Sequence, residues 1–182
     1  MNSADEKMNT YVYHEGEGTK GGNNVYSLVY TNLEDLGIVN EWEESGKKPG
    51  RGLTLVFDNC GGQNKNHMVL RLPLWLLDIG LYKEVKVIFL IAGHTKNICD
   101  RLFKDLKKDC HKSDIFQMDT LINLMNKSDN VKCFNVTHDN FQKWDKLFGK
   151  FYKKLESNTT NKKSYVFIHW TRSWCSSNAE GF

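Results

Sequence analysis

The chain has 182 residues, of which 40% are hydrophobic, 26% charged and 12% aromatic; this composition fits a globular domain with an appended lobe and excludes a disordered tail or a fibre. The 25 basic and 22 acidic residues leave a formal net charge of +3, which permits contact with nucleic acid but does not argue for it. The 5 cysteines are scattered without a Cys-x-x-Cys pair, which disfavours a disulfide framework or a zinc ribbon and favours a reducing compartment.

The N-terminal residues, MNSADEKMNT, are polar, and we expect residues 1–10 to be disordered. They contain no apolar segment of the kind that directs secretion. The most apolar stretch, Leu72–Leu77, is much shorter than the ~20 residues of a membrane span. We therefore expect a chain that is neither secreted nor partnered with a membrane.

The first part of the chain alternates patterns typical of strands and helices. Residues 53–57 and 84–92 are near-continuous apolar runs, as in strands buried on both faces. Each is followed by apolar residues at helical spacing, and Gly37 and Gly80 mark helix ends. In chain order, the predicted elements are strand 11–13, helix 25–36, loop 47–52, strand 53–57, helix 68–79, strand 84–92 and helix 95–110.

This alternation predicts the α/β class, with the three strands in one sheet and helices flanking it. Residues 11–112 form the expected core. Beyond Lys112 the pattern becomes irregular, and residues 113–182 are expected to be a small C-terminal α+β extension. Its predicted elements are helix 120–126, strand 131–136, helix 141–155 and strand 165–170.

Two carboxylates occupy positions where α/β sheets carry their functional groups. Asp58 follows a predicted strand, and Asp100 lies about one turn inside the helix after the next strand. Because parallel strands end at one edge of a sheet, both side chains would converge there and suit Mg²⁺, which prefers oxygen ligands. On spacing alone, structural interpretations are favoured, with Asp58 as a cap and Asp100 as a partner of Lys104.

Longer motifs surround both acids. DNCGGQNKN at 58–66 and GHTKNICDRLFKDLKK at 93–108 resemble two signature blocks of DDE-type, transposase-like proteins with a retroviral-integrase, ribonuclease H-like core. YVYHEGEGTKGGNNVYSLVYTNL, from Tyr11 to Leu33, resembles the segment that precedes them in that family. The resemblance spans about 11–108, with a weaker match to about Leu155. It implies a mobile-element origin, a ribonuclease H-like mixed sheet, nuclear or nucleocytoplasmic location, and DNA cutting and joining by three acids with Mg²⁺ or Mn²⁺.

The resemblance assigns roles to residues of this chain. It implies that Asp58 is the second acid and Asp100 the third. His94, just before a predicted helix N-cap, is an auxiliary candidate, either as a metal ligand or general acid or as an orienting hydrogen-bond partner. Gln63, Asn64 and Asn66 would shape the loop beneath the metals. We expect the opening strand with the first acid to be missing, so that the isolated chain is truncated and its cleavage activity impaired or lost.

Two acids near the start of the chain are candidates to replace the missing one. Glu15 and Glu17 follow the strand predicted at 11–13, but they stand in a glycine-rich, solvated turn. We do not expect them to complete the acid cluster.

A basic region lies near the C-terminus, where residues 143–163 contain seven lysines against Asp145 and Glu156. Trp144 and Phe148 interleave with them at helical spacing. Such a helix could hold DNA phosphates, or it could pack its aromatics on the core and leave its lysines in water; these alternatives stay open. The candidate DNA-binding residues are Lys104, Lys107, Lys108, Lys150, Lys153 and Lys154. The rival to an enzyme is a non-catalytic remnant that binds DNA or a protein through 143–163.

Cysteine chemistry is the weakest functional hypothesis. Cys60, Cys99 and His94 suggest a zinc site, but Cys99 belongs to the apolar stripe of its helix and no pair has zinc-finger spacing. Buried thiols are the preferred interpretation. Homo-oligomer formation stays open.

Overall fold

The computed structural model describes residues 7–19, 21–50, 52–57, 67–90, 98–152 and 167–171, without the side chains of 67, 68, 98, 100, 109 and 167–171. The chain forms two compact units, each built from two stretches of sequence. Unit 1 comprises Met1–Thr19 and Thr95–Phe141, and unit 2 comprises Lys20–His94 and Gln142–Phe182.

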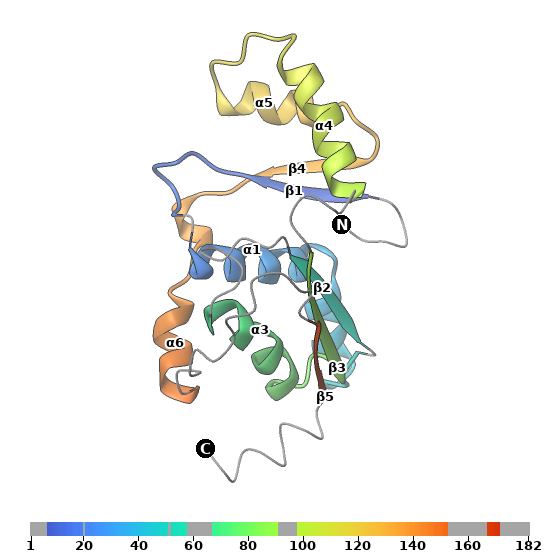
Figure 1. Cartoon of the computed structure of the whole chain (residues 1–182), viewed down its shortest axis with the longest axis vertical. Coiled ribbons are helices and arrows are strands. Elements are labelled where there is room, and N and C mark those ends of the chain that lie inside the picture. The colour runs from blue at the N-terminus through green and yellow to red at the C-terminus, as the bar shows by residue number, and fades with distance from the viewer. Residues whose placement is uncertain are drawn as a thin grey trace. The chain divides into compact units, whose positions relative to one another are not determined.

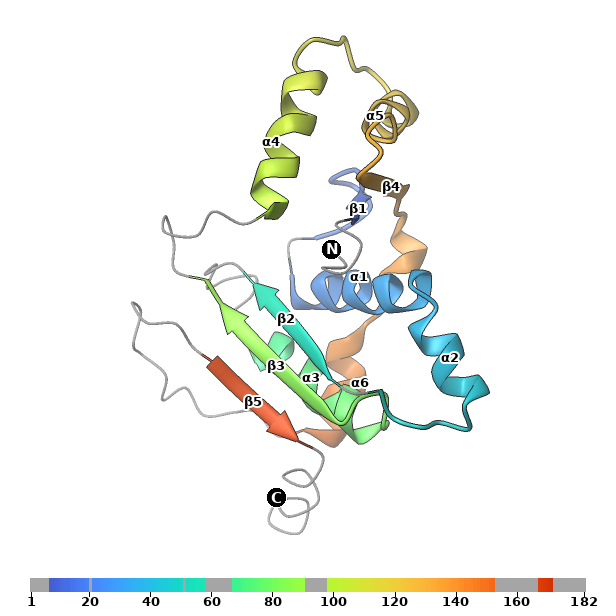
Figure 2. The ribbon, with the colours of Figure 1, turned by 90° about the vertical axis from the view of Figure 1, so that its right-hand side faces the viewer.

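Unit 2 contains a three-stranded mixed sheet in the order β2-β3-β5. Parallel strands β2 and β3 pair from Leu53 opposite Val85 to Phe57 opposite Phe89, and β5 runs antiparallel beside β3 (Figure 2). The elements of unit 2 are α1 (Gly22–Asp35), α2 (Ile38–Glu44), β2 (Leu53–Phe57), α3 (His67–Asp78), β3 (Glu84–Phe89), α6 (Trp144–Phe151) and β5 (Phe167–Thr171) (Figure 1).

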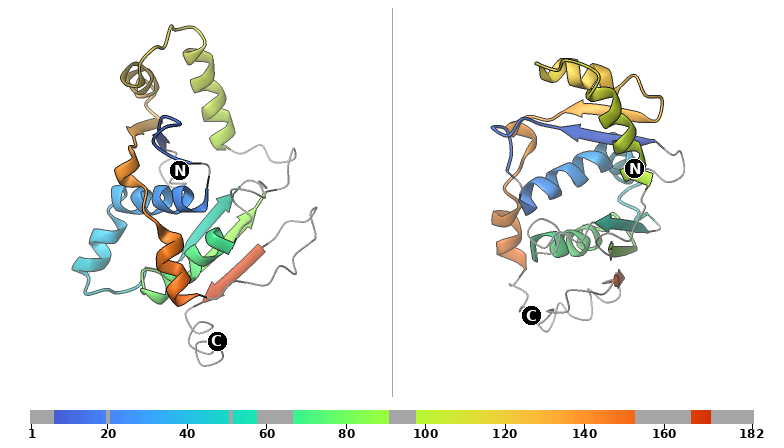
Figure 3. Two further views of the ribbon diagram at one scale, coloured as in Figure 1. Left: turned by 90° about the vertical axis from the view of Figure 1, so that its left-hand side faces the viewer. Right: turned by 45° about the horizontal axis from the view of Figure 1, so that its top comes forward.

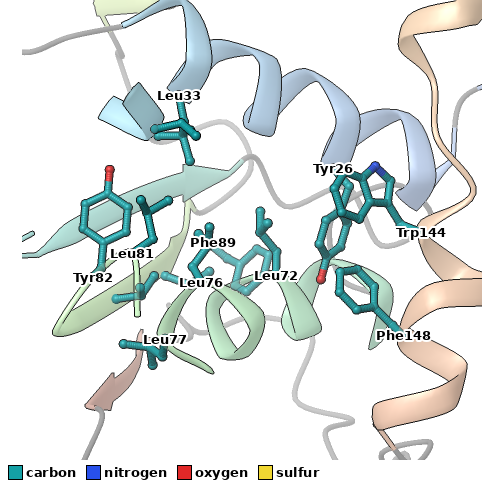
Figure 4. Packing of buried hydrophobic residues seen from close by; sticks show 13 residues of the cluster. Tyr26, Leu33, Leu72, Leu76, Leu77, Leu81, Tyr82, Phe89, Trp144 and Phe148 are labelled. Carbon is teal, nitrogen blue, oxygen red and sulfur yellow. The ribbon is translucent and has the colours of Figure 1, made fainter. Parts of the chain in front are cut away.

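The core of unit 2 lies on the side of the sheet that α3 covers. Strand β3 alternates strictly, with Val85, Val87 and Phe89 buried and the residues between them half-buried. Leucines of α3 and aromatic residues of α1 and α6 complete the cluster, as Figure 4 shows. The labelled members of the cluster are Tyr26, Leu33, Leu72, Leu76, Leu77, Leu81, Tyr82, Phe89, Trp144 and Phe148.

Ser27 fixes the N-terminal end of α6 to α1. Its hydroxyl accepts hydrogen bonds from Trp144 Nε1 (2.9 Å) and the backbone N–H of Gln142 (3.0 Å), and it donates to the Asn23 carbonyl (2.9 Å). Beside it, Asn23 Nδ2 donates to Asp145 Oδ1 at 3.0 Å, and the Asp145 backbone N–H donates to Asn23 Oδ1 at 2.9 Å. These bonds join segments about 120 residues apart, so both stretches are needed to complete unit 2.

Unit 1 is built on a two-stranded parallel sheet, in which β1 (Met8–Val12) pairs with β4 (Val131–Asn135). Helices α4 (Ile98–Cys110) and α5 (Met118–Met125) pack on one face of this pair (Figures 1 and 3). A short 3₁₀ helix, η1 (His138–Asn140), follows β4. The buried residues of its core are Met8, Leu106, Met125, Val131 and Cys133.

The α/β class predicted from the sequence is confirmed, and its ribonuclease H-like refinement stays a prediction. Helices and strands occur close to the predicted ranges, but the expectation of one sheet for the first three strands is wrong: β1 pairs with β4, in unit 1. Hydrophobic pattern marks a strand without naming its partner.

The units also divide the chain differently from the predicted core 11–112 and extension 113–182. Strand β1 begins at Met8, so that Met8–Thr10, assigned to the polar N-terminus, are part of a sheet. Helix α2 lies where the sequence pattern indicated no element. Within the described ranges, no helix is long and apolar enough to cross a membrane.

Candidate functional site

The predicted metal edge is the carboxyl end of the β2–β3 pair. Phe57 and Phe89 are register partners, and the backbone N–H of Leu90 donates to the Phe57 carbonyl at 2.8 Å. Both strands therefore deliver the chain to one edge of the sheet, where α/β folds place ligand-binding residues. Asp58 is the next residue in sequence after Phe57.

Most of the predicted catalytic and loop-shaping residues of the metal edge lie outside the described residues. These are Asp58, His94, Gln63, Asn64 and Asn66. Asp100 belongs to α4 by its backbone, but its side chain is not described, and α4 is part of unit 1 whereas β2 and β3 are part of unit 2. The convergence of Asp58 and Asp100 stays a prediction. Among the side chains that the structure describes, no group of three or more His, Cys, Asp or Glu could hold a metal ion.

Three of the predicted DNA-binding lysines lie on α4. Its apolar face, which includes Leu102 and Leu106, packs on the core of unit 1. The opposite side is basic because Lys and Arg recur there at helical spacing. The exposed basic residues of α4 and the turn after it are Arg101, Lys104, Lys107, Lys108, His111 and Lys112. Asp105 neutralises part of this face through an ion pair with Lys108 (3.2 Å).

On α6 the aromatic and basic residues separate as the structural alternative expects. Trp144 and Phe148 are buried and pack on Tyr26, with ring centroids 5.7 and 4.8 Å away. Lys146 and Lys150 are exposed, whereas Lys153 and Lys154 lie outside the described residues. The aromatic face of the basic segment therefore serves the core, and only its lysines are candidates for contact with phosphate.

The thiols that suggested a zinc site are also partly described. Cys99 is half-buried and packs against the core of unit 1, in line with the buried-thiol interpretation. Cys60 lies outside the described residues.

A second cluster of ionisable groups lies at the carboxyl end of the β1–β4 pair. Glu17 Oε2 accepts the backbone N–H of His138 at 2.7 Å and lies 3.3 Å from its Nδ1. His138 Nε2 is 2.9 Å from Asp139 Oδ1. We call Glu17, His138 and Asp139 the carboxylate–histidine cluster.

Hydrogen bonding determines the electrostatics of this cluster. The backbone N–H of His138 lowers the pKa of Glu17 most, desolvation opposes it, and the imidazoles of His138 and His14 add smaller lowering effects, so that the net shift is downward. Sequence reasoning considered Glu17 as a replacement acid but missed His138, which is 121 residues away. The available signal was that acidic and histidine residues directly follow two predicted strands.

One family matches the chain. A protein-family model described as "Domain of unknown function (DUF7869)" matches residues 32–175, which include parts of both units. No curated protein and no solved structure matches the chain.

Proposed function

The chain belongs to the DUF7869 family, and we propose that it is a mobile-element-derived, DDE transposase-like domain that acts on DNA in the nucleus. The ancestral chemistry would be metal-dependent cleavage of a phosphodiester bond followed by strand transfer. Because the resemblance assigns two acids, Asp58 and Asp100, and no third within this sequence, the proposed activity is impaired in the isolated chain.

The parallel, in-register ending of β2 and β3 is the observation that supports this proposal most. It brings the chain to a single sheet edge immediately before Asp58, as a ribonuclease H-like arrangement requires. The mixed sheet, with β5 antiparallel to β3, is compatible with such a fold. The motif DNCGGQNKN then supplies the residue types expected at that edge.

The donor chemistry of the two acids fits the expected ion. Carboxylate oxygens are the ligands that Mg²⁺ prefers, and Asp58 and Asp100 would each offer one carboxylate. A bound Mg²⁺ or Mn²⁺ would supply positive charge against the phosphate. Around it, the proposed tasks of this chain are to carry the two acids and to bind the DNA backbone.

Metal titration and DNA nicking test the acid assignment together. We expect Mn²⁺ binding, measured by calorimetry, to weaken at least tenfold in both Asp58→Asn and Asp100→Asn. The matched control is Asp114→Asn, which neutralises an exposed acid between α4 and α5. Any Mg²⁺- or Mn²⁺-dependent nicking should vanish in the two site variants and persist in the control. Equal metal binding by all four proteins would contradict the assignment.

The exposed lysines favour a second candidate, a non-catalytic remnant that binds DNA or a protein. Lys104, Lys107 and Lys108 lie on the basic side of α4, and Lys150 lies on α6. Phosphate contacts by lysine release counterions, so each contact steepens the salt dependence of binding. This candidate requires no contribution from Asp58 or Asp100.

Salt-dependent DNA affinity separates the basic surface from the acid edge. Changing Lys104, Lys107 and Lys108 together to Gln should weaken duplex binding and reduce the slope of log K against log salt by about 2–3. The matched control changes Lys48, Lys83 and Lys127 to Gln, which removes the same charge from other exposed positions. Equal losses in both triple variants would indicate a general charge effect and contradict the assignment to α4.

A further inference from the structure

The chain passes between the two units at three points, and two of these come shortly after β1 and β4 in the sequence. Unit 1 ends its first stretch at Thr19 and its second at Phe141. The residues that lead to these points, 13–19 and 136–141, begin together because β1 and β4 are parallel and the Val136 N–H donates to the Val12 carbonyl (2.9 Å). We call them the two exit segments of unit 1.

The exit segments contact each other at two points within unit 1. Glu17 on the first accepts the backbone N–H of His138 on the second and faces its imidazole. Tyr13 and Phe141 form an edge-to-face aromatic pair, with centroids 5.0 Å apart and an interplanar angle of 73°. The contacts therefore extend from the end of the strands to the last residue of unit 1.

Local hydrogen bonds hold the shape of each exit segment. On the first, the Glu17 backbone N–H donates to the His14 carbonyl (2.9 Å), and the Gly16 N–H donates to His14 Nδ1 (3.0 Å). On the second, Thr137 and Asn140 form a reciprocal capping box around η1. Both sides of the Glu17–His138 contact are thus pre-shaped, which reduces the entropy that the contact must overcome.

We propose that the carboxylate–histidine cluster is a pH-sensitive clamp, which fastens the two exit segments of unit 1 together when His138 is protonated and loosens them when it is neutral. Histidine is the side chain that ordinarily changes charge between about pH 5 and pH 8. The proposal is independent of any activity on DNA.

The number of N–H donors on the His138 imidazole determines whether protonation tightens or loosens the clamp. Both ring nitrogens of His138 face carboxylates, Glu17 at Nδ1 and Asp139 at Nε2. A neutral imidazole carries one N–H, so it can donate to only one of them, whereas the imidazolium donates to both. Protonation therefore completes the chain from Glu17 to Asp139.

Neighbouring groups limit how much the protonation of His138 changes the strength of the clamp. His14 lies near Glu17 on the same segment; its neutral ring accepts the Gly16 N–H at Nδ1, and its protonation would add positive charge but end that hydrogen bond. Glu15 is an exposed acid beside it. Because Glu17 also accepts the backbone N–H of His138, loss of the imidazole charge loosens the clamp without abolishing it. The lowered pKa of Glu17 keeps its carboxylate ionised through the range in which histidine titrates.

Hydrogen exchange of the exit segments tests the clamp in the full chain. The reporters are the backbone amides of His138, Asn140 and Phe141, compared at about pH 6 and pH 8 after correction for intrinsic exchange. In the native chain we expect protection to be roughly two- to fivefold greater at the lower pH, as for an exposed ion pair. Glu17→Gln should remove this difference, and Glu15→Gln should retain it as the charge-matched control.

A second variant and an internal standard keep the test decisive. His138→Gln removes the titrating group and should also abolish the pH difference. Protection of the Val136 amide, which belongs to the β1–β4 pairing, reports that unit 1 is folded in each variant. A pH difference that survives in Glu17→Gln or His138→Gln, or that is missing from the native chain, overturns the proposal.

Discussion

Units 1 and 2 each contain a pair of parallel strands covered by helices, but their described cores differ greatly in size. Unit 2 buries aromatic residues of α1 and α6, leucines of α3 and valines of β3 in one cluster. Among the described side chains, the core cluster of unit 1 contains five buried residues, and a two-stranded sheet is marginal without such support. We infer that unit 2 carries most of the stability and that unit 1 opens at lower free energy.

The largest expected effect is the loss of a core aromatic from unit 2. Phe148 is 0% exposed and packs on Tyr26 and Trp144, so Phe148→Ala should lower the free energy of unfolding by about 3–5 kcal/mol. Phe151, on the same helix, is 70% exposed, and Phe151→Ala should change it by about 0.5 kcal/mol or less. Chemical denaturation of both variants measures the difference, and similar losses would contradict the described face of α6.

A cavity in the core of unit 1 should lower the free energy of unfolding by less than the loss of Phe148 does in unit 2. Leu106 is buried between α4 and the β1–β4 sheet, and Leu106→Ala should destabilise unit 1 by about 2–3 kcal/mol. Hydrogen exchange should show the loss in β1 and β4, while amides of β2 and β3 keep their protection. Equal loss in both sheets would mean that the units open as one and would break the comparison.

The next largest effect is expected from the hydrogen bonds of the Ser27 hydroxyl in unit 2. Ser27→Ala leaves the buried indole N–H of Trp144 without its acceptor, and we expect a loss of about 2 kcal/mol. Ser45→Ala is the control, because this exposed hydroxyl also bonds to backbone groups but at the surface. Thermal unfolding of the two variants compares the buried hydroxyl with the exposed one.

Alkaline pH should weaken unit 2 through Tyr82. Burial raises the pKa of Tyr82 from 10.0 to about 12, so between these values the unfolded chain loses the phenolic proton before the folded chain does. Stability therefore falls as pH rises through this range, by on the order of 1 kcal/mol. Tyr82→Phe should remove this part of the pH dependence, and an unchanged slope would contradict it.

Acid should weaken unit 1, with the smallest effect of the series. The pKa of Glu17 is lowered in the folded state, so its contribution to stability is present above the ordinary value of 4.5 and is lost as pH falls through the lowered value. Glu17→Gln should flatten the acid end of the stability profile of unit 1. Unfolding followed at β1 and β4 amides below about pH 5 measures this change.

Sequence periodicity was enough to locate most helices and strands. The run Leu53–Phe57 is a strand with the predicted bounds, and the apolar spacing of Leu72, Trp75 and Leu76 is that of α3. These signals are local, because the apolar residues of one buried face repeat at the period of the helix or strand that carries them. Helix α2 gave no such signal because it has seven residues, of which only Val39 is buried.

Long-range pairing could not be read from local patterns. No local pattern in Met8–Val12 indicates that its partner strand is Val131–Asn135. The contact of Glu17 with His138 could not be predicted either, because it depends on this strand pairing. Burial also decided what spacing left open: Trp144 and Phe148 had the pattern of a nucleic-acid-binding face and of a core, and the structure places them in the core. For Asp58 and Asp100 the sequence resemblance remains the basis of their assignment.

The interleaving of the two units has a consequence for how the chain reaches its native state. During synthesis, β1 leaves the ribosome early but finds its partner only when β4 has been made, and α1 waits in the same way for α6. Neither unit can close before both β4 and α6 have been synthesised, so each early stretch must wait for a partner more than 100 residues further along the chain. A fragment ending at Lys112 would lack both β4 and α6, and we expect it to aggregate rather than to behave as a soluble domain.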